Sequence, residues 1–127
     1  MAIGSDQDIV AARQRGRAYA AGLGFSVMDT TLIATAISEL ARNIVSYAGQ
    51  GQITFERVTN GNREGIQIVA SDEGPGIPDI RQALRDGFST SGSLGLGLPG
   101  VRRLMDEFDV TSQPGKGTTV AVRKWRQ

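Results

Sequence analysis

The chain has 127 residues, of which 39% are hydrophobic and 21% charged, and its 14 basic and 13 acidic side chains nearly cancel. This size and composition predict one globular domain over 1–127, and the balanced charge gives no reason to expect nucleic acid or an anionic membrane as partner. Cysteine and histidine are both absent. Disulfides, thiolate or imidazole metal sites and Ser-His catalysis are therefore excluded within the chain, so acid–base work falls to Asp, Glu, Lys or Tyr.

The first predicted element is a helix near the N-terminus. Asp6 or Asp8 can cap this helix, which is expected to run to about Ala21. Gly22 and Gly24 follow at the place where a helix commonly ends.

A longer second helix is expected to follow. Ser26 or Asp29 can cap it, and it is expected to end near Ala48, before Gly49. Apolar side chains recur along it at helical spacing and predict a buried face: Ile33, Ile37, Leu40, Ile44 and Tyr47.

The remainder is expected to alternate between strands and helices. Alternating apolar residues on either side of a Thr-Asn-Gly-Asn turn at 59–62 predict a hairpin with strands around 53–58 and 66–72. The expected elements after it are a loop at 73–78, helices at 79–85 and 98–108 separated by a glycine-rich loop at 87–97, and strands from 110 and over 118–124, joined by a tight turn at 114–117. Such blocks favour an α+β sandwich, with one mixed or antiparallel sheet and the helices layered on one face.

Two polar side chains stand out on the second helix. Glu39 and Asn43 are four residues apart, so they point the same way, beside the apolar face. Taken alone, the pair is typical of a solvated helix edge, with Glu39 paired to Arg42 or Arg13. A functional role requires another segment to bring a polar ligand to them.

Glycine-rich segments downstream could supply that ligand. Asp72-Glu73-Gly74-Pro75-Gly76 leaves a strand, where Asp72 could accept a hydrogen bond from a base's exocyclic amine, although an ordinary turn also fits. GLGLPG at 95–100 matches the dinucleotide-binding pattern but lacks the strand before it, and it lacks the lysine of a P-loop. Small residues before a helix start still expose N–H groups to an anion, while a flexible loop without a ligand fits equally well.

The combination and order of these segments are more specific than any one of them. E-x-x-x-N, D-x-G-x-G, G-x-G-L and G-T, spread over 39–118, resemble the N, G1, G2 and G3 boxes of the GHKL (Bergerat-fold) ATPases. Over essentially the whole chain, segments such as ELARNI, DEGPGIPDIR and DGFSTSGSLGLGLPGVRRLMDEF are similar to the RsbT-type serine/threonine switch kinases of the stressosome. The resemblance implies the Bergerat ATP-binding sandwich, with ATP and Mg²⁺ as cofactors.

The resemblance also implies roles for the matching residues. Glu39 is the implied general base, Asn43 the implied Mg²⁺ ligand and Asp72 the implied partner of the adenine amine, while Thr118 is expected to close the far side of the base pocket. A lid over 88–97 is expected to hold the phosphates. The implied nucleotide-binding residues are Asn43, Asp72, Gly74, Gly76, Ile77, Thr90, Ser91, Gly92, Gly95, Leu96, Gly97, Leu98 and Thr118, and Arg42, Arg85 and Lys116 are candidates for phosphate or partner contacts.

The implied reaction is transfer of the γ-phosphate of ATP to serine or threonine on STAS-domain proteins, namely a small RsbS-like antagonist and a larger RsbR-like scaffold. The released kinase would then activate an effector such as a PP2C-type phosphatase. Two alternatives remain: an anti-sigma-factor kinase that binds a sigma factor directly, and a sequestration module with little catalysis. A cytoplasmic location is expected, because the sequence shows neither a leader-like segment nor an apolar run long enough to span a bilayer.

Overall fold

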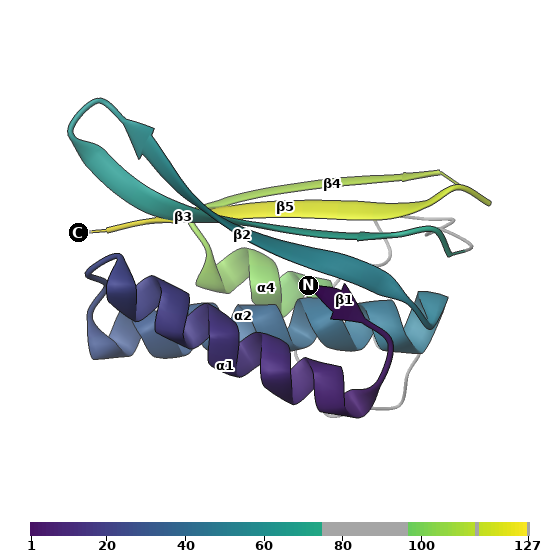
Figure 1. Cartoon of the computed structure of the whole chain (residues 1–127). Helices are drawn as coiled ribbons and strands as arrows, with labels where there is room; N and C mark the ends of the chain where they lie inside the picture. The colour runs from purple at the N-terminus through teal and green to yellow at the C-terminus, as the bar shows by residue number, and fades with distance from the viewer. Residues whose placement is uncertain (75–96, 114, 127) are drawn as a thin grey trace.

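A computed structural model describes residues 1–74, 97–113 and 115–126. Its elements are β1 (Ala2–Ile3), α1 (Asp6–Gly22), α2 (Val27–Asn43), a π-helical segment η1 (Ile44–Ala48), β2 (Gly51–Asn60), β3 (Arg63–Asp72), α4 (Gly97–Leu104), β4 (Glu107–Gln113) and β5 (Gly117–Trp125). The strands form one antiparallel sheet in the order β1-β2-β3-β5-β4, and the three α-helices within the described ranges lie on one face of it (Figure 1). The predicted α+β fold is confirmed. The helix predicted at 79–85 and the loop over 87–96 lie outside the described residues.

A serine fixes the start of each long helix. The Ser26 hydroxyl accepts a backbone N–H three residues along at 3.1 Å, as predicted for α2. For α1 the predicted caps are wrong, because the cap is Ser5, whose hydroxyl accepts the N–H of Asp8. Asp6 and Asp8 lie inside the first turn, where carboxylates favour the positive end of the helix dipole. The Asp8 carboxylate also accepts the N–H of Gly4 at 2.8 Å.

The core lies between the inner face of the sheet and α2. The predicted apolar face of α2 is buried except at Tyr47, which is 42% exposed. Tyr47 belongs to η1, where the wider π-helical turn changes the rotation per residue and moves it out of the row. The fully buried members of the core include Ile33, Ile37, Leu40, Ile53, Ile66, Ile68, Val101 and Val122. Burying a side chain of this size stabilises the fold by about 1.5–3 kcal/mol.

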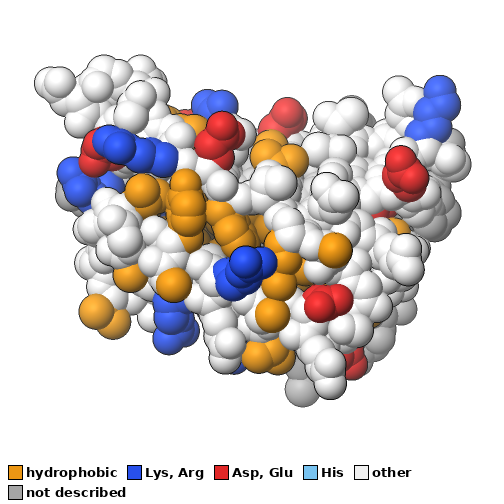
Figure 2. All heavy atoms as spheres, viewed as in Figure 1, with side chains coloured by type: hydrophobic (Ala, Val, Ile, Leu, Met, Phe, Trp, Pro, Cys, Tyr) orange, Lys and Arg blue, Asp and Glu red, His pale blue; other side chains and the backbone are white. Residues whose placement is uncertain are grey.

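Helix α1 completes the helical layer by packing closely on α2. A Cβ at Gly16 would lie 2.0 Å from Ile37 Cδ1, so the absence of a side chain there permits the close approach of the two helices. Apolar side chains also gather on the surface where α1 meets the sheet (Figure 2). Tyr19 of α1 and Phe55 of β2 make a ring contact across this layer, with ring centroids 6.2 Å apart. Among the described residues, no helix is both long and apolar enough to cross a membrane.

The C-terminal part departs from prediction at one boundary. The helix expected to reach Phe108 ends at Leu104, and β4 begins at Glu107. Asp106 explains the early end, because its N–H donates to the carbonyl of Arg123 at 2.9 Å and its carboxylate accepts the N–H of Trp125 at 2.8 Å. Because of these contacts to β5, the chain leaves the helix and joins the sheet before the apolar helical spacing in the sequence ends at Phe108. The short strand β1 was not predicted from the sequence.

Candidate functional site

Glu39 is a buried carboxylate on the core side of α2, only 6% exposed. Its Oε1 accepts a hydrogen bond from Arg42 Nη1 at 2.6 Å, and its Oε2 accepts the backbone N–H of Gly97 at 3.2 Å. The interpretation of Glu39 as part of a solvated helix edge is therefore wrong, although the predicted pairing with Arg42 is confirmed. The contact with Gly97 joins the second helix to the start of α4, 58 residues along the chain.

Asn43 is half-buried at the last residue of α2, one turn beyond Glu39. The helix continues as η1 until Gly49, whose positive φ of 81° and N–H bond to the Ile44 carbonyl end it. Single π-helical turns within helices are frequent at functional sites. At the end of η1, a Cβ placed on Gly74 would lie 2.6 Å from the Cβ of Ala48. The end of this helix therefore lies directly against the segment that leaves β3.

Asp72 is the last residue of β3, and its Oδ1 accepts the N–H of Gly74 at 2.9 Å. This side-chain turn holds the carboxylate at the strand end. Asp72 pairs in register with Thr118 of β5. Beside it, Gly117 has φ of +92°, and a Cβ there would lie 2.0 Å from the Asp72 carbonyl oxygen. Only glycine fits this approach, which brings the predicted G1 and G3 boxes together.

Thr118 links the pair to the edge strand. It is half-buried, and its Oγ1 lies 2.8 Å from the Oγ of Ser112 in β4. The register places Asp72, Thr118 and Ser112 side by side on three neighbouring strands. Ser112 was not predicted as part of the site. The turn predicted at 114–117 could have found it, since a hairpin closed there pairs Ser112 with Thr118.

The remaining predicted residues divide into two groups. Gly97 opens α4 with φ of +65°, and Leu98 is buried against the core. Lys116 is exposed in the β4–β5 turn, where its N–H donates to the Gln113 carbonyl. The others lie outside the described residues: Gly76, Ile77, Arg85, Thr90, Ser91, Gly92, Gly95 and Leu96.

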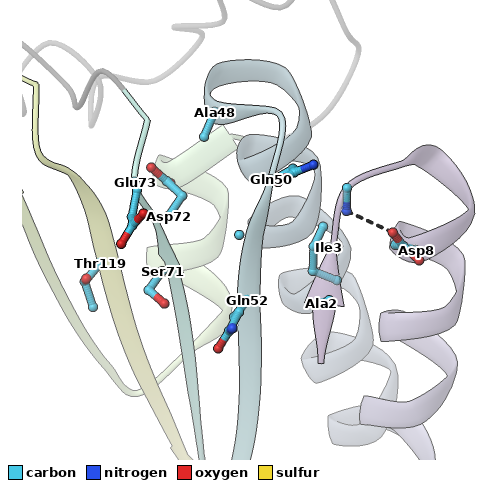
Figure 3. A pocket seen from close by; sticks show the side chains of 12 residues that line it. Ala2, Ile3, Asp8, Ala48, Gln50, Gln52, Ser71, Asp72, Glu73 and Thr119 are labelled. Carbon is cyan, nitrogen blue, oxygen red and sulfur yellow. Dashed lines mark hydrogen bonds between the residues drawn. The ribbon is translucent and has the colours of Figure 1, made fainter.

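A polar depression of about 950 Å³ lies beside the end of β3. Asp72 borders it at the end of β3 and Glu73 just after that strand, Ala48 borders it from η1, and Asp8 lies on α1, where its bond to Gly4 is drawn (Figure 3). Its lining residues are Ala2, Ile3, Gly4, Asp8, Ala48, Gln50, Gly51, Gln52, Ser71, Asp72, Glu73 and Thr119. Asp72 is the one residue among the described ones predicted to bind nucleotide that lines this depression. Glu39, on α2, is not among the lining residues.

Residues 28–127 match the family described as histidine kinase-, DNA gyrase B-, and HSP90-like ATPase. The chain belongs to this ATPase family. Two solved structures share the fold of this GHKL domain at low sequence identity. The mycobacterial sensor histidine kinase MprB has a TM-score of 0.58 at 17% identity, covering 99% of this chain and 97% of its own. The catalytic domain of histidine kinase ThkA has a TM-score of 0.54 at 21% identity, covering 76% and 67%.

Curated relatives of the GHKL domain match at higher identity. The serine/threonine-protein kinase RsbT of Bacillus subtilis (strain 168) is 59% identical over 121 residues, 95% of this chain and 91% of its own length. The anti-sigma F factor of Thermoanaerobacter sp. (strain X514) is 35% identical over 114 residues, 85% and 78% of the two chains. The predicted enzyme class, an ATP-dependent serine/threonine protein kinase, is thereby confirmed.

Proposed function

We propose that this GHKL domain is a partner-switching kinase that transfers the γ-phosphoryl group of ATP to STAS-domain proteins. The observation that carries the proposal is the buried carboxylate of Glu39, 3.2 Å from the N–H that opens α4. The 59% identity to a serine/threonine kinase supports a hydroxyl, and not water, as the acceptor. The substrates we propose are an RsbS-like antagonist and an RsbR-like scaffold.

Glu39 is proposed to act as the general base. Its carboxylate takes the proton of the acceptor hydroxyl while that oxygen bonds to the γ-phosphorus, and the bond from this phosphorus to the bridging oxygen breaks to release ADP. Because phosphoryl transfer depends chiefly on positioning, a base fixed on two sides suits the reaction. An acceptor delivered by a docked protein would complete the geometry.

Asn43 is proposed to hold Mg²⁺ through its amide oxygen. Mg²⁺ usually takes one or two protein ligands and fills its octahedron with water and phosphate oxygens. Asn43 fits this arrangement, because its half-buried side chain at the end of α2 offers one amide oxygen, a hard ligand of the kind Mg²⁺ takes. When bound, the ion would neutralise charge on the phosphates, and Asn43 would orient it one turn from Glu39.

The other end of the site is proposed to bind adenine. Asp72 is fixed by the N–H of Gly74 and lies beside Thr118, which Ser112 orients in turn. A carboxylate held this way can accept a hydrogen bond from the exocyclic amine of the base. We propose that residues 76–77, 90–92 and 95–98 complete the nucleotide site.

Release after phosphorylation is proposed to free the kinase for a downstream effector such as a PP2C-type phosphatase, in the cytoplasm. The physical basis is linkage, since a partner that loses affinity after phosphorylation vacates a shared surface. Direct binding of a sigma factor is the second candidate, supported by the 35% identity to an anti-sigma F factor. The larger identity to RsbT favours the STAS substrates.

The test is incubation of the protein with Mg²⁺-ATP and the STAS proteins encoded beside its gene, followed by mass spectrometry. We expect phosphoserine or phosphothreonine on at least one STAS protein. A STAS protein left unmodified, while a sigma factor binds tightly in the same preparation, would favour the anti-sigma candidate. Absence of both outcomes would favour a sequestration module.

A further inference from the structure

The Glu39 carboxylate is held by two partners of different kinds. Arg42, from the same helix, binds Oε1 at 2.6 Å, and Gly97, from α4, binds Oε2 at 3.2 Å. Each carboxylate oxygen of Glu39 therefore has its own hydrogen-bond donor, and the orientation of the carboxylate is fixed. Among the described residues, no buried side-chain nitrogen or oxygen lacks a hydrogen-bond partner, so the arrangement around Glu39 is internally satisfied.

We propose that Arg42 is a positioning residue for the reaction: it fixes the Glu39 carboxylate so that Oε2 faces the start of α4. This inference rests on the proposed role of Glu39 as the base. With Oε1 held by the guanidinium, rotation of the carboxylate is restricted, and the second oxygen stays on the side where α4 begins.

The positions of the two side chains support this division of roles. The Arg42 side chain is 36% exposed and that of Glu39 only 8%, so the guanidinium lies at the rim of the site and the carboxylate inside it. A charged pair three residues apart on an exposed helix surface usually stabilises the helix only slightly. A contact to a buried carboxylate can matter more, because removing one partner leaves the other charge poorly compensated.

Besides the pairing with Glu39, the sequence raised a second role for Arg42, a direct contact to phosphate or partner. The structure instead places its Nη1 on Glu39. A phosphate contact would act mainly on nucleotide affinity, whereas a positioning role acts on turnover. The two roles therefore predict different kinetic changes in the same variant.

The kinetic test compares Arg42→Ala and Arg42→Lys with the matched control Arg57→Ala, which removes an exposed ion pair to Glu64 on the β2–β3 hairpin. Arg42→Ala should lower kcat for phosphotransfer roughly 10- to 100-fold with an unchanged KM for ATP, because displacing a positioned group by about 1 Å can cost about 10²-fold. Arg42→Lys should recover part of kcat, and the control should retain it. An unchanged kcat in Arg42→Ala would overturn the proposal, as would a raised KM alone.

A double-mutant cycle separates this proposal from the proposed function. If Arg42 acts through Glu39, Arg42→Ala should not slow the residual rate of a Glu39→Gln protein further. Equal additional slowing in both backgrounds would refute the positioning role and leave the base intact. Full activity of Glu39→Gln would instead refute the proposed base itself.

A second readout needs no nucleotide. In ¹H–¹⁵N NMR of the free protein, Arg42→Ala should shift the Gly97 amide resonance, because the carboxylate that accepts its proton is no longer held. Arg57→Ala should leave that resonance in place. A Gly97 resonance identical in wild type and Arg42→Ala would contradict the proposal even if the kinetics changed.

Discussion

The contact between Gly117 and the Asp72 backbone can be tested by adding one methyl group. In Gly117→Ala, the new Cβ would stand 2.0 Å from the Asp72 carbonyl oxygen and 2.8 Å from the Cα of Glu73. Real Cβ atoms do not approach backbone that closely, so β3 and β5 must separate locally. Because Asp72 is the proposed adenine ligand, the displacement would affect stability and nucleotide binding together.

Gly115 offers a matched control for the cost of placing an L-residue at a positive φ. Gly115 also has a positive φ, +77°, but a Cβ there would meet nothing within 4 Å. An L-residue in such a left-handed conformation costs about 1–2 kcal/mol. We expect Gly115→Ala to lose that amount, and Gly117→Ala to lose about 1–3 kcal/mol more for the forced displacement.

Thermal and urea unfolding of wild type, Gly115→Ala and Gly117→Ala would measure this difference, and calorimetry with Mg²⁺-ATP would measure the affinities. We expect Gly115→Ala to bind nucleotide as wild type does and Gly117→Ala to bind at least tenfold more weakly. Should Gly117→Ala not fold, the contrast in stability with a folded Gly115→Ala is itself the predicted result. Equal losses of stability and equal affinities in the two variants would refute the reasoning.

Three further substitutions test separate parts of the site and fold. Asp72→Asn keeps an oxygen for the Gly74 N–H but loses the carboxylate, so it should preserve the melting temperature and weaken ATP binding at least tenfold by calorimetry; unchanged affinity would refute the adenine role. Asn43→Ala should weaken Mg²⁺-ATP more than metal-free ATP, and an equal loss for both would argue against a metal ligand. Ser26→Ala should lower the free energy of unfolding by about 1 kcal/mol through loss of the α2 cap, and an unchanged urea midpoint would contradict the capping role.

The sequence predicted those parts of the fold whose signals are local. The β2–β3 hairpin followed from a turn signal at 59–62 between alternating strands, and Gly61 does take the required positive φ, +62°. The burial of Ile33 and Ile37 followed from their spacing. A local sequence pattern is sufficient in both cases, because the spacing of the residues that are buried on one face determines whether the segment forms a helix or a strand.

The errors arose where distant segments decide the structure. The helix expected to reach Phe108 ends at Leu104 because Asp106 binds β5, and nothing near Asp106 in the sequence reveals that partner. Tyr47 is exposed because the helix widens into η1. The first case shows tertiary contacts overriding a helical pattern, and the second shows a change of helix type within one continuous helix.

The sequence predicts which residues form the proposed site, but it does not predict their geometry. The order of the four boxes pointed to Glu39, Asn43, Asp72 and Thr118, and the structure brings the last two into register. The contact from Glu39 to Gly97 spans 58 residues and has no signature in the sequence. Ser112 differs, because the turn predicted at 114–117 already implies its pairing with Thr118, and the structure adds the contact between the two hydroxyls.

The most direct test of the central claim is phosphotransfer by Glu39→Gln. The substitution removes the basic oxygen but retains the side chain's size and one acceptor. We predict unchanged ATP affinity by calorimetry and at least a 100-fold slower single-turnover phosphorylation of the STAS partner, in line with the usual 10²–10⁴-fold contribution of a general base. Phosphorylation of the STAS partner at the wild-type rate would contradict the account.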